Sequence, residues 1–183
     1  MSALVSILLV IMLAIGSVFG FYNGMVSARE NVDSKWSQVD NQLQRRGDLI
    51  PNLVNTVKGY AAHEKEVFQS VSDARAKMAG AKSVSDKLAA NAELNSALSR
   101  LLAVAENYPQ LKADQNFRQL QDELSGTENR IAVARKDYND AVQSYNTKIK
   151  SLPYSLFAGT LGFTARDHFK AEETAKTVPK VQF

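Results

Sequence analysis

Cysteine is absent from the 183-residue sequence. The chain therefore forms no disulfide, iron–sulfur cluster or thiolate zinc site, and it offers no cysteine for lipid attachment. Histidine is scarce, with two residues, and Val67 stands four residues after His63, where a zinc-protease helix needs a second histidine. His168 stands without an acidic cluster of metal-ligand spacing. We expect no catalytic residue, no metal site and no cofactor.

Charged residues are absent from residues 1–28, and residues 4–21 are almost wholly apolar. At about 1.5 Å per residue, the run from 4 to 21 covers roughly 27 Å as a helix, close to the ~30 Å hydrocarbon thickness of a bilayer. This pattern predicts a membrane-spanning helix. The alternative is a cleaved signal peptide, which requires basic residues before the apolar run, whereas the first basic residue here is Arg29.

Basic residues occur only after this segment, beginning at Arg29 and Lys35. The positive-inside rule therefore favours an outside N-terminus and a cytoplasmic soluble domain. The 22 basic and 19 acidic residues are interspersed, so the chain has no concentrated basic field. We expect no nucleic-acid partner.

Three glycines of the apolar segment, Gly16, Gly20 and Gly24, are spaced four apart. This spacing places them on one helix face and lets a second helix approach closely. The ridge predicts transmembrane packing and a homo-oligomer. The alternative is that these residues reflect the ordinary glycine content of membrane helices.

After the membrane segment, apolar residues recur at alternating spacings of four and three, which predicts one long amphipathic helix up to about residue 78 with a coiled-coil-like seam. Pro51 is expected to kink this helix near residues 47–51, and a true turn at Gly47 is the alternative. The seam consists of Val32, Trp36, Val39, Leu43, Ile50, Leu53, Val57, Tyr60, Val67, Val71, Ala74 and Met78.

Two further helices are predicted downstream. Ser83 or Ser85 is placed to cap one that ends before Pro109, and a long helix with heptad spacing covers about residues 117–149 until Pro153 ends it. No stretch alternates with a period of two, so the class is all-α. We expect an N-terminal transmembrane helix and a bundle of about four long antiparallel helices, the last of them short. The expected parts are an anchor (1–28), a long-helix bundle (29–152) and an aromatic tail (153–183).

Polar side chains interrupt the seam around residue 46. Arg46 falls on the apolar register, where a guanidinium needs a partner, and Asp48 is the nearest candidate in sequence. Alternatively, Asp48 caps a helix and both Arg45 and Arg46 extend to solvent. The predicted seam and interface residues are Trp36, Arg45, Arg46, Asp48, Pro51 and Tyr60.

The tail contains more aromatic residues than a solvated terminus needs. Phe157, Phe163 and Phe169 are its expected interface residues, and a short polar helix is predicted around residues 165–174. Large apolar side chains require cover. The chain's own bundle is one candidate, and a neighbouring subunit, a partner or the lipid interface is the other.

Three runs of the sequence are distinctive: QLQRR at 42–46, DLIPNLV at 48–54 and LAVAENYP at 102–109. In these runs, and over nearly its whole length, the sequence closely resembles the LemA family. Further matching stretches are residues 29–30, 36–40, 58–61, 128–132, 134–135, 138–139, 145–146, 157–158 and 162–163, and Asn41 departs from an expected apolar position. The resemblance implies a bacterial membrane protein with one N-terminal transmembrane helix and a helical bundle, and it implies no established catalytic residue.

The combined features favour assembly over catalysis. We expect a single-pass protein of the bacterial inner (cytoplasmic) membrane that serves as a self-assembling scaffold or adaptor in the cell envelope. Its expected partners are the lipid bilayer, further copies of itself and other membrane proteins. One alternative is a sensory or regulatory ligand-binding module, with a polar pocket around Arg45, Arg46, Asp48, Tyr60 and His63. Another is a subunit of a membrane protease or transport system.

Overall fold

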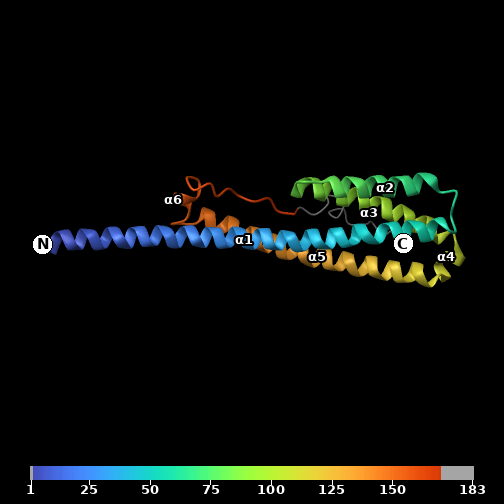
Figure 1. The fold of residues 1–183 in the computed structure, drawn as a ribbon, viewed down its shortest axis with the longest axis horizontal. Helices are drawn as coiled ribbons and strands as arrows, with labels where there is room; N and C mark the ends of the chain where they lie inside the picture. Colours follow the sequence, from blue (N-terminus) through green and yellow to red (C-terminus); the bar gives the residue numbers. More distant parts are fainter. Residues whose placement is uncertain (1, 170–183) are drawn as a thin grey trace, which may run out of the picture. The chain divides into compact units, whose positions relative to one another are not determined.

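A computed structural model describes residues 2–169. This part of the chain is helical and contains no strand, so the predicted all-α class is confirmed. Its helices are α1 (Ser2–Lys58), α2 (Lys65–Gly80), α3 (Val84–Glu106), α4 (Pro109–Ala113), α5 (Gln115–Lys150) and α6 (Ser155–Ala158) (Figure 1). The chain divides into two compact units: unit 1 comprises Met1–Gln38 and Ala134–His168, and unit 2 includes Val39–Val133. Both α1 and α5 contribute to each unit.

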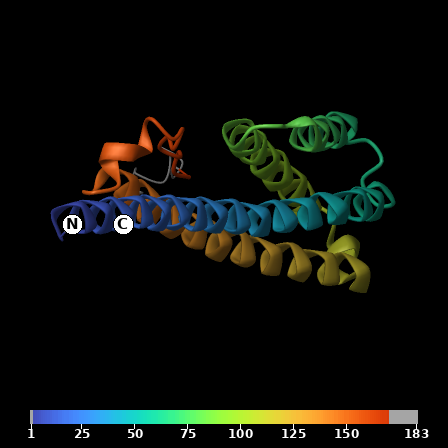
Figure 2. The same ribbon diagram turned by 60° about the vertical axis from the view of Figure 1, so that its left-hand side comes forward.

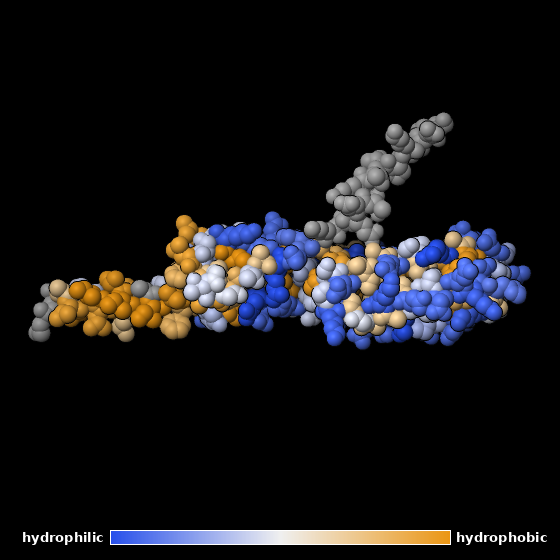
Figure 3. Space-filling view, turned by 90° about the horizontal axis from the view of Figure 1, so that it is seen from above, coloured by the Kyte–Doolittle hydropathy of each residue, from blue (hydrophilic) through white to orange (hydrophobic). Residues whose placement is uncertain are grey.

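The N-terminal part of α1 is apolar and exposed on all sides. Large side chains from Leu4 to Phe19 point away from the protein, and Figure 3 shows hydrophobic residues throughout the visible surface of this segment. Within the described residues, α1 is the one helix long and apolar enough to cross a membrane.

The predicted extent of the first long helix is wrong. Instead of continuing to residue 78, α1 ends at Lys58 and α2 begins at Lys65. The chain reverses through turns in which the N–H groups of Tyr60 and Ala61 both donate to the Val57 carbonyl, at 3.0 and 2.9 Å. The apolar spacing is in phase on both sides and therefore concealed the break.

Pro51 lies inside α1, and the helix continues through residues 47–51. The alternative of a turn at Gly47 is therefore wrong. A proline in this position lacks the N–H that would bond the carbonyl four residues back, so the continuous helix requires another donor for Gly47.

In unit 2, α2 and α3 form an antiparallel hairpin that packs beside α1 (Figure 2). Ser83 caps α3, as predicted, by accepting a hydrogen bond from the Asp86 N–H at 3.0 Å. Most of the predicted seam lies in the core, Leu43 and Leu53 among it, whereas Tyr60 of the seam is 42% exposed. Ile131 of α5 is fully buried as well.

In unit 1, α1 and α5 run antiparallel. Trp36 packs edge-to-face on Tyr138 with ring centroids 5.5 Å apart, and Lys148 Nζ donates to the Gly24 carbonyl at 3.2 Å. The start of the paired part of α1 therefore lies beside the end of α5, and residues later in α1 lie beside residues earlier in α5. Met25, Val32 and Tyr145 fill the space between the two helices.

The prediction of a short helix around residues 165–174 is wrong for residues 165–169, which the structure describes. Residues 163–169 are extended and non-helical, and residues 170–174 lie outside the described part. Side chains of α5 bond the main-chain carbonyls of Thr164, Arg166 and Asp167. These bonds engage carbonyls that a helix would use internally and favour extended chain.

Asp114 provides a pH-dependent contribution to stability. Its Oδ1 accepts from the Phe117 N–H at 2.9 Å and its Oδ2 from the Tyr60 hydroxyl at 3.0 Å, and these two hydrogen bonds lower the pKa of Asp114. A lowered folded-state pKa stabilises the fold above the unfolded pKa of about 3.9 and loses this effect as pH falls through the folded value. We predict that Asp114→Asn lowers the thermal midpoint at pH 7.

The difference between wild type and Asp114→Asn should shrink as the pH falls from 5 toward 2. Circular dichroism melts of the full chain in detergent measure it. The matched control is Asp122→Asn, an exposed carboxylate on α5, which should follow wild type at each pH. A pH-independent difference for Asp114→Asn would contradict the proposed linkage.

Candidate functional site

Arg46 lies at a junction of three helices in unit 2. Its side chain is buried, with 7% of the residue exposed, and its Nη1 donates to Glu128 Oε2 at 2.6 Å and to Asn91 Oδ1 at 3.5 Å. The guanidinium thus joins α1 to α3 and α5. The interpretation that Asp48 partners Arg46 is wrong, because residues two apart lie on different faces of a helix.

Gly47 and Pro51 create a docking point for α2. Pro51 has no N–H to offer the Gly47 carbonyl, and Arg75 Nε of α2 donates to that oxygen at 2.8 Å instead. A Cβ added at Gly47 would lie 3.1 Å from Met78 Cε, so α2 packs closely against this position. The carbonyl that proline leaves without a helical donor is satisfied by a neighbouring helix.

A cavity of about 290 Å³ lies beside this docking point. Its charged lining residues are the carboxylates Asp40 and Asp48 and the cations Arg75 and Lys87, with Lys87 Nζ donating to Asp40. The remaining lining residues are Leu43, Gln44, Gly47, Met78 and Ala79. The mixed charges suit a small polar or zwitterionic molecule.

The pocket predicted around Arg45, Arg46, Asp48, Tyr60 and His63 does not form as such. Asp48 lines the cavity, whereas Arg46 bonds Glu128, and Tyr60 lies beyond the end of α1 and bonds Asp114. Arg45 and His63 are exposed. Among residues 2–169, no group of three His, Cys, Asp or Glu side chains is placed to hold a metal ion.

Unit 2 also has an open groove of about 540 Å³. Arg46 and Glu128 line it together with Asn95 of α3, whose Oδ1 is buried without a hydrogen-bond partner. The ion pair therefore forms part of the wall of this groove, whereas the cavity beside Gly47 is lined by other residues.

The three glycines of the predicted transmembrane ridge differ in their surroundings. A Cβ added at Gly16 or Gly20 would meet no atom of the chain within 4 Å, whereas at Gly24 it would lie 3.4 Å from Tyr154 Oη. Gly24 therefore packs on the chain's own tail. Self-association through Gly16 and Gly20 stays a prediction.

The predicted tail aromatics lie on α1 or in the interior. Phe157 stacks on Phe21 with centroids 6.2 Å apart, and Phe163 is buried against Tyr22 at 5.8 Å and lies under the Arg29 guanidinium at 5.3 Å. Phe169 is buried as well. The chain itself thus covers Phe163 and Phe169.

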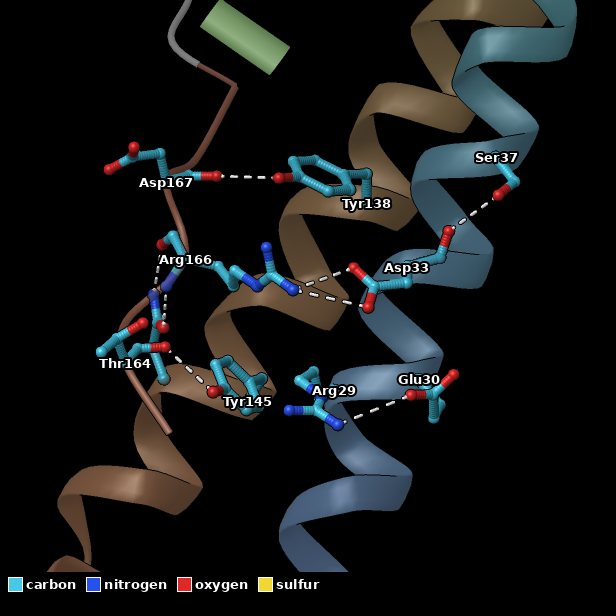
Figure 4. Close-up of polar contacts among 10 residues, drawn as sticks. Arg29, Glu30, Asp33, Ser37, Tyr138, Tyr145, Thr164, Arg166 and Asp167 are labelled. Carbon is cyan, nitrogen blue, oxygen red and sulfur yellow. Dashed lines mark hydrogen bonds and ion pairs between the residues drawn. The ribbon is translucent and has the colours of Figure 1, made fainter. Parts of the chain in front are cut away.

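The extended segment 163–168 is fastened to the helices by its main chain (Figure 4). The hydroxyls of Tyr138 and Tyr145 donate to the carbonyls of Asp167 and Thr164 at 3.0 and 2.9 Å. Burial raises the pKa of both phenols, which keeps them protonated donors. We call residues 163–168 the strap.

Arg166 fixes the middle of the strap. Its N–H donates to Asn146 Oδ1 at 2.9 Å, and the Asn146 amide donates to the Arg166 carbonyl at 2.8 Å. The Arg166 guanidinium bonds both carboxylate oxygens of Asp33 at 3.2 and 3.4 Å. Tyr138 and Tyr145 belong to the heptad spacing predicted for residues 117–149, but the sequence contains no signal for their hydroxyl partners.

Sequence reasoning also missed Arg75, Asn91 and Glu128. The missing N–H of Pro51 signalled that the Gly47 carbonyl needs a donor, yet the donor is 28 residues away in sequence. Glu128 is 82 residues from Arg46. Only the packing of the helices identifies such partners.

Comparison with known proteins gives matches over most of the chain. A model described as "LemA family" matches residues 35–183. Magnetosome protein MamQ 2 of Paramagnetospirillum magneticum is 28% identical over an alignment 185 positions long, in which 85% of this chain and 67% of that protein are covered. Magnetosome protein MamQ of Magnetospirillum gryphiswaldense is 27% identical with the same coverage. Protein LemA of Metamycoplasma hominis is 23% identical, over 91% of this chain and 78% of that protein.

We predict unequal effects for the two partners of the Arg46–Glu128 pair. Glu128→Ala leaves a largely buried guanidinium without its carboxylate and should destabilise unit 2 by about 2–3 kcal/mol, below the range for full burial because Glu128 is partly exposed. Arg46→Met removes the charge and keeps apolar volume, so it should cost less, about 1 kcal/mol. Urea unfolding in detergent measures both.

Glu93→Ala in the exposed Lys77–Glu93 pair serves as the control and should remain close to wild type. The double variant Arg46→Met/Glu128→Ala should be more stable than Glu128→Ala alone. If Arg46→Met proves the most damaging change, the buried charge is not the dominant cost.

A second prediction concerns the Gly47 carbonyl. Arg75→Met removes its donor and should cost about 1–3 kcal/mol, the usual range for leaving a buried polar group unsatisfied. In a Pro51→Ala background the new N–H can bond the same carbonyl, so the cost of Arg75→Met should fall by about 1 kcal/mol. A double-mutant cycle by urea unfolding measures this coupling. Arg100→Met, an exposed arginine on α3, should show no coupling to Pro51→Ala.

Proposed function

We propose that this chain, which belongs to the LemA family by its match over residues 35–183, is a membrane-anchored, non-catalytic scaffold or adaptor. In this proposal residues 1–28 are the anchor, 29–152 the bundle and 153–183 the tail. The protein assembles through helix packing and organises partners in the bacterial envelope. The single observation that carries the proposal is the exposed, almost wholly apolar surface at the start of α1.

The anchor follows from what that surface requires. An exposed apolar segment of this length is unfavourable in water and matches the hydrocarbon thickness of a bilayer. The described part of the chain leaves the segment uncovered, since none of its most apolar stretch is buried. Lipid acyl chains would cover the apolar side chains on every face of this helix.

The scaffold role follows from the continuity of α1. The apolar segment passes into the amphipathic part without a loop, and the same helix ends at Lys58. The helix joins the apolar segment to the bundle without a flexible linker, which suits a scaffold.

Assembly is supported by two features. Gly16 and Gly20 have open space around them in the single chain, which is what close packing by a second helix requires. The relatives named magnetosome proteins carry the name of a cellular structure. From that name we carry over only a role as a component of an assembly, and we place this assembly at the inner membrane with the bundle in the cytoplasm.

The cavity beside Gly47 favours a second candidate function, a sensory or regulatory ligand-binding module. Asp48 and Arg75 converge on it from α1 and α2, so a bound polar molecule would contact both helices. Binding there would alter the packing of α2 on α1. A ligand that protects the full chain against unfolding, and loses this effect in Asp48→Ala, would support this candidate.

Measurement of the particle mass of the full-length protein in mild detergent tests the scaffold. We predict a regular oligomer for wild type and a smaller particle for Gly20→Leu, because leucine blocks close helix approach. A side chain at Gly20 begins in open space within the chain, so a loss of mass reports an intermolecular contact.

Gly80→Leu is the matched control, since Gly80 also has open space but lies on α2 outside the apolar segment. It should retain the wild-type mass. Flotation with vesicles separates anchoring from assembly: the full chain should float, and a chain that begins at Arg29 should not. A monomeric wild type would discard self-assembly and favour the ligand-binding candidate.

A further inference from the structure

Residues 151–162, which include α6 and which we call the α6 loop, expose three leucines. Leu152, Leu156 and Leu161 are 75%, 67% and 42% exposed. The loop contains no charged side chain. We propose that the α6 loop lies in the headgroup region of the bilayer as a second membrane contact beside the spanning helix. This inference rests on the anchor of the proposed function.

Aromatic contacts fix the position of the α6 loop along α1. Tyr154 packs edge-to-face on Phe21 with ring centroids 5.4 Å apart. Phe157 stacks on the same Phe21 ring with centroids 6.2 Å apart. Tyr154 Oη would lie 3.4 Å from a Cβ at Gly24. The loop is therefore held beside residues 21–24 of α1.

This height coincides with the edge of the hydrocarbon layer. The apolar run ends at Phe21 and accounts for roughly 27 Å of the ~30 Å core. The remaining ~3 Å, about two residues of helix, brings the edge of the hydrocarbon core to about residues 22–24, where the headgroup region of about 5–7 Å begins. Phe21, Tyr22 and Tyr154 form the aromatic cluster typical of a membrane interface.

The polar residues around the α6 loop suit an anionic lipid surface. Lys148 and Lys150 occupy the last turn of α5, directly before the loop. Lys148 Nζ bonds the Gly24 carbonyl and lies 5.8 Å from the centre of the Tyr154 ring, and Lys150 is exposed. Basic residues beside an apolar loop bind anionic headgroups while the apolar side chains enter the upper acyl region.

Lipid explains this surface better than a second copy of the chain does. The exposed leucines belong to the loop whose Tyr154 and Phe157 pack on Phe21, the end of the apolar segment, so one lipid surface covers both without a further protein contact. The polar side chains that fasten the strap, such as Tyr145 and Arg166, bond partners within the same chain. A second copy as the occupant remains an outcome that the experiment distinguishes.

The absence of cysteine allows a clean test. In the full chain, Leu156→Cys is labelled with an environment-sensitive fluorophore and reconstituted into vesicles of phosphatidylethanolamine and phosphatidylglycerol that carry nitroxide lipids. We expect a blue-shifted emission and at least a two-fold stronger quenching by shallow nitroxides than by nitroxides at the bilayer centre. Leu161→Cys should behave similarly and serves if Leu156→Cys folds poorly.

Val133→Cys is the matched control, because Val133 is an exposed apolar residue of α5 outside the loop, 63% exposed. Its label should emit as in water and resist both quenchers. A water-like Leu156 label in protein that floats with the vesicles would overturn the lipid contact and leave the anchor intact. A blue-shifted label that lipid nitroxides do not quench would assign the surface to a second copy. Failure to float would remove the anchor and this inference together.

Discussion

Because α1 continues as one helix from an all-apolar surface to an amphipathic one, its two parts need different surroundings. The first part exposes side chains such as Ile11 on every face, whereas farther along the helix Val39 and Leu53 are fully buried. A helix hydrophobic all round belongs in lipid, and one with a single apolar stripe belongs on a protein core. The antiparallel partner α5 begins to pack on α1 near Gly24, just past the end of the apolar run. The division of the helix between two solvents thus sets where the bundle starts.

Polar groups on the seam give the packing of unit 2 a defined register. Apolar heptads alone tolerate sliding by whole turns, because each turn presents similar side chains. The Arg46 guanidinium and the Gly47 carbonyl are satisfied only when Glu128, Asn91 and Arg75 stand opposite them. If one helix slid along another, these groups would be buried without partners. The cost of a buried polar group without a partner exceeds the net stabilisation that its hydrogen bond provides. Their contribution is therefore to exclude wrong arrangements of the helices of unit 2.

The sequence pattern predicted helices and a helix cap, which depend on neighbouring residues. It did not predict contacts between residues that are distant in the sequence. The heptad spacing predicted α5, and the Ser83 cap predicted the start of α3, because both signals lie within a few residues. The break after Lys58 was missed since the apolar register resumes in phase in α2, although Glu64, the N-cap position of α2, interrupted that register. The sequence does not predict the partners of Arg46 or the hydrogen-bond acceptors of the Tyr138 and Tyr145 hydroxyls, because acidic residues and hydrogen-bond acceptors occur throughout the chain. These parts of the candidate site require the tertiary packing.

Magnitudes separate anchoring from assembly. Twelve large apolar side chains between Leu4 and Phe19 are exposed, and at about 1.5–3 kcal/mol each their transfer from water to lipid is favourable by at most about 20–35 kcal/mol. No glycine contact approaches this, so insertion does not depend on oligomerisation. Once in lipid, however, apolar side chains gain nothing by leaving lipid for another helix, and only close packing or hydrogen bonds drive association. Within the span, Gly16 and Gly20 are the positions that permit such an approach, whereas Gly24 is already packed on Tyr154. The hydrophobic side chains therefore favour insertion of this segment into lipid, whereas close approach at Gly16 and Gly20, rather than hydrophobicity, would favour pairing of two such helices.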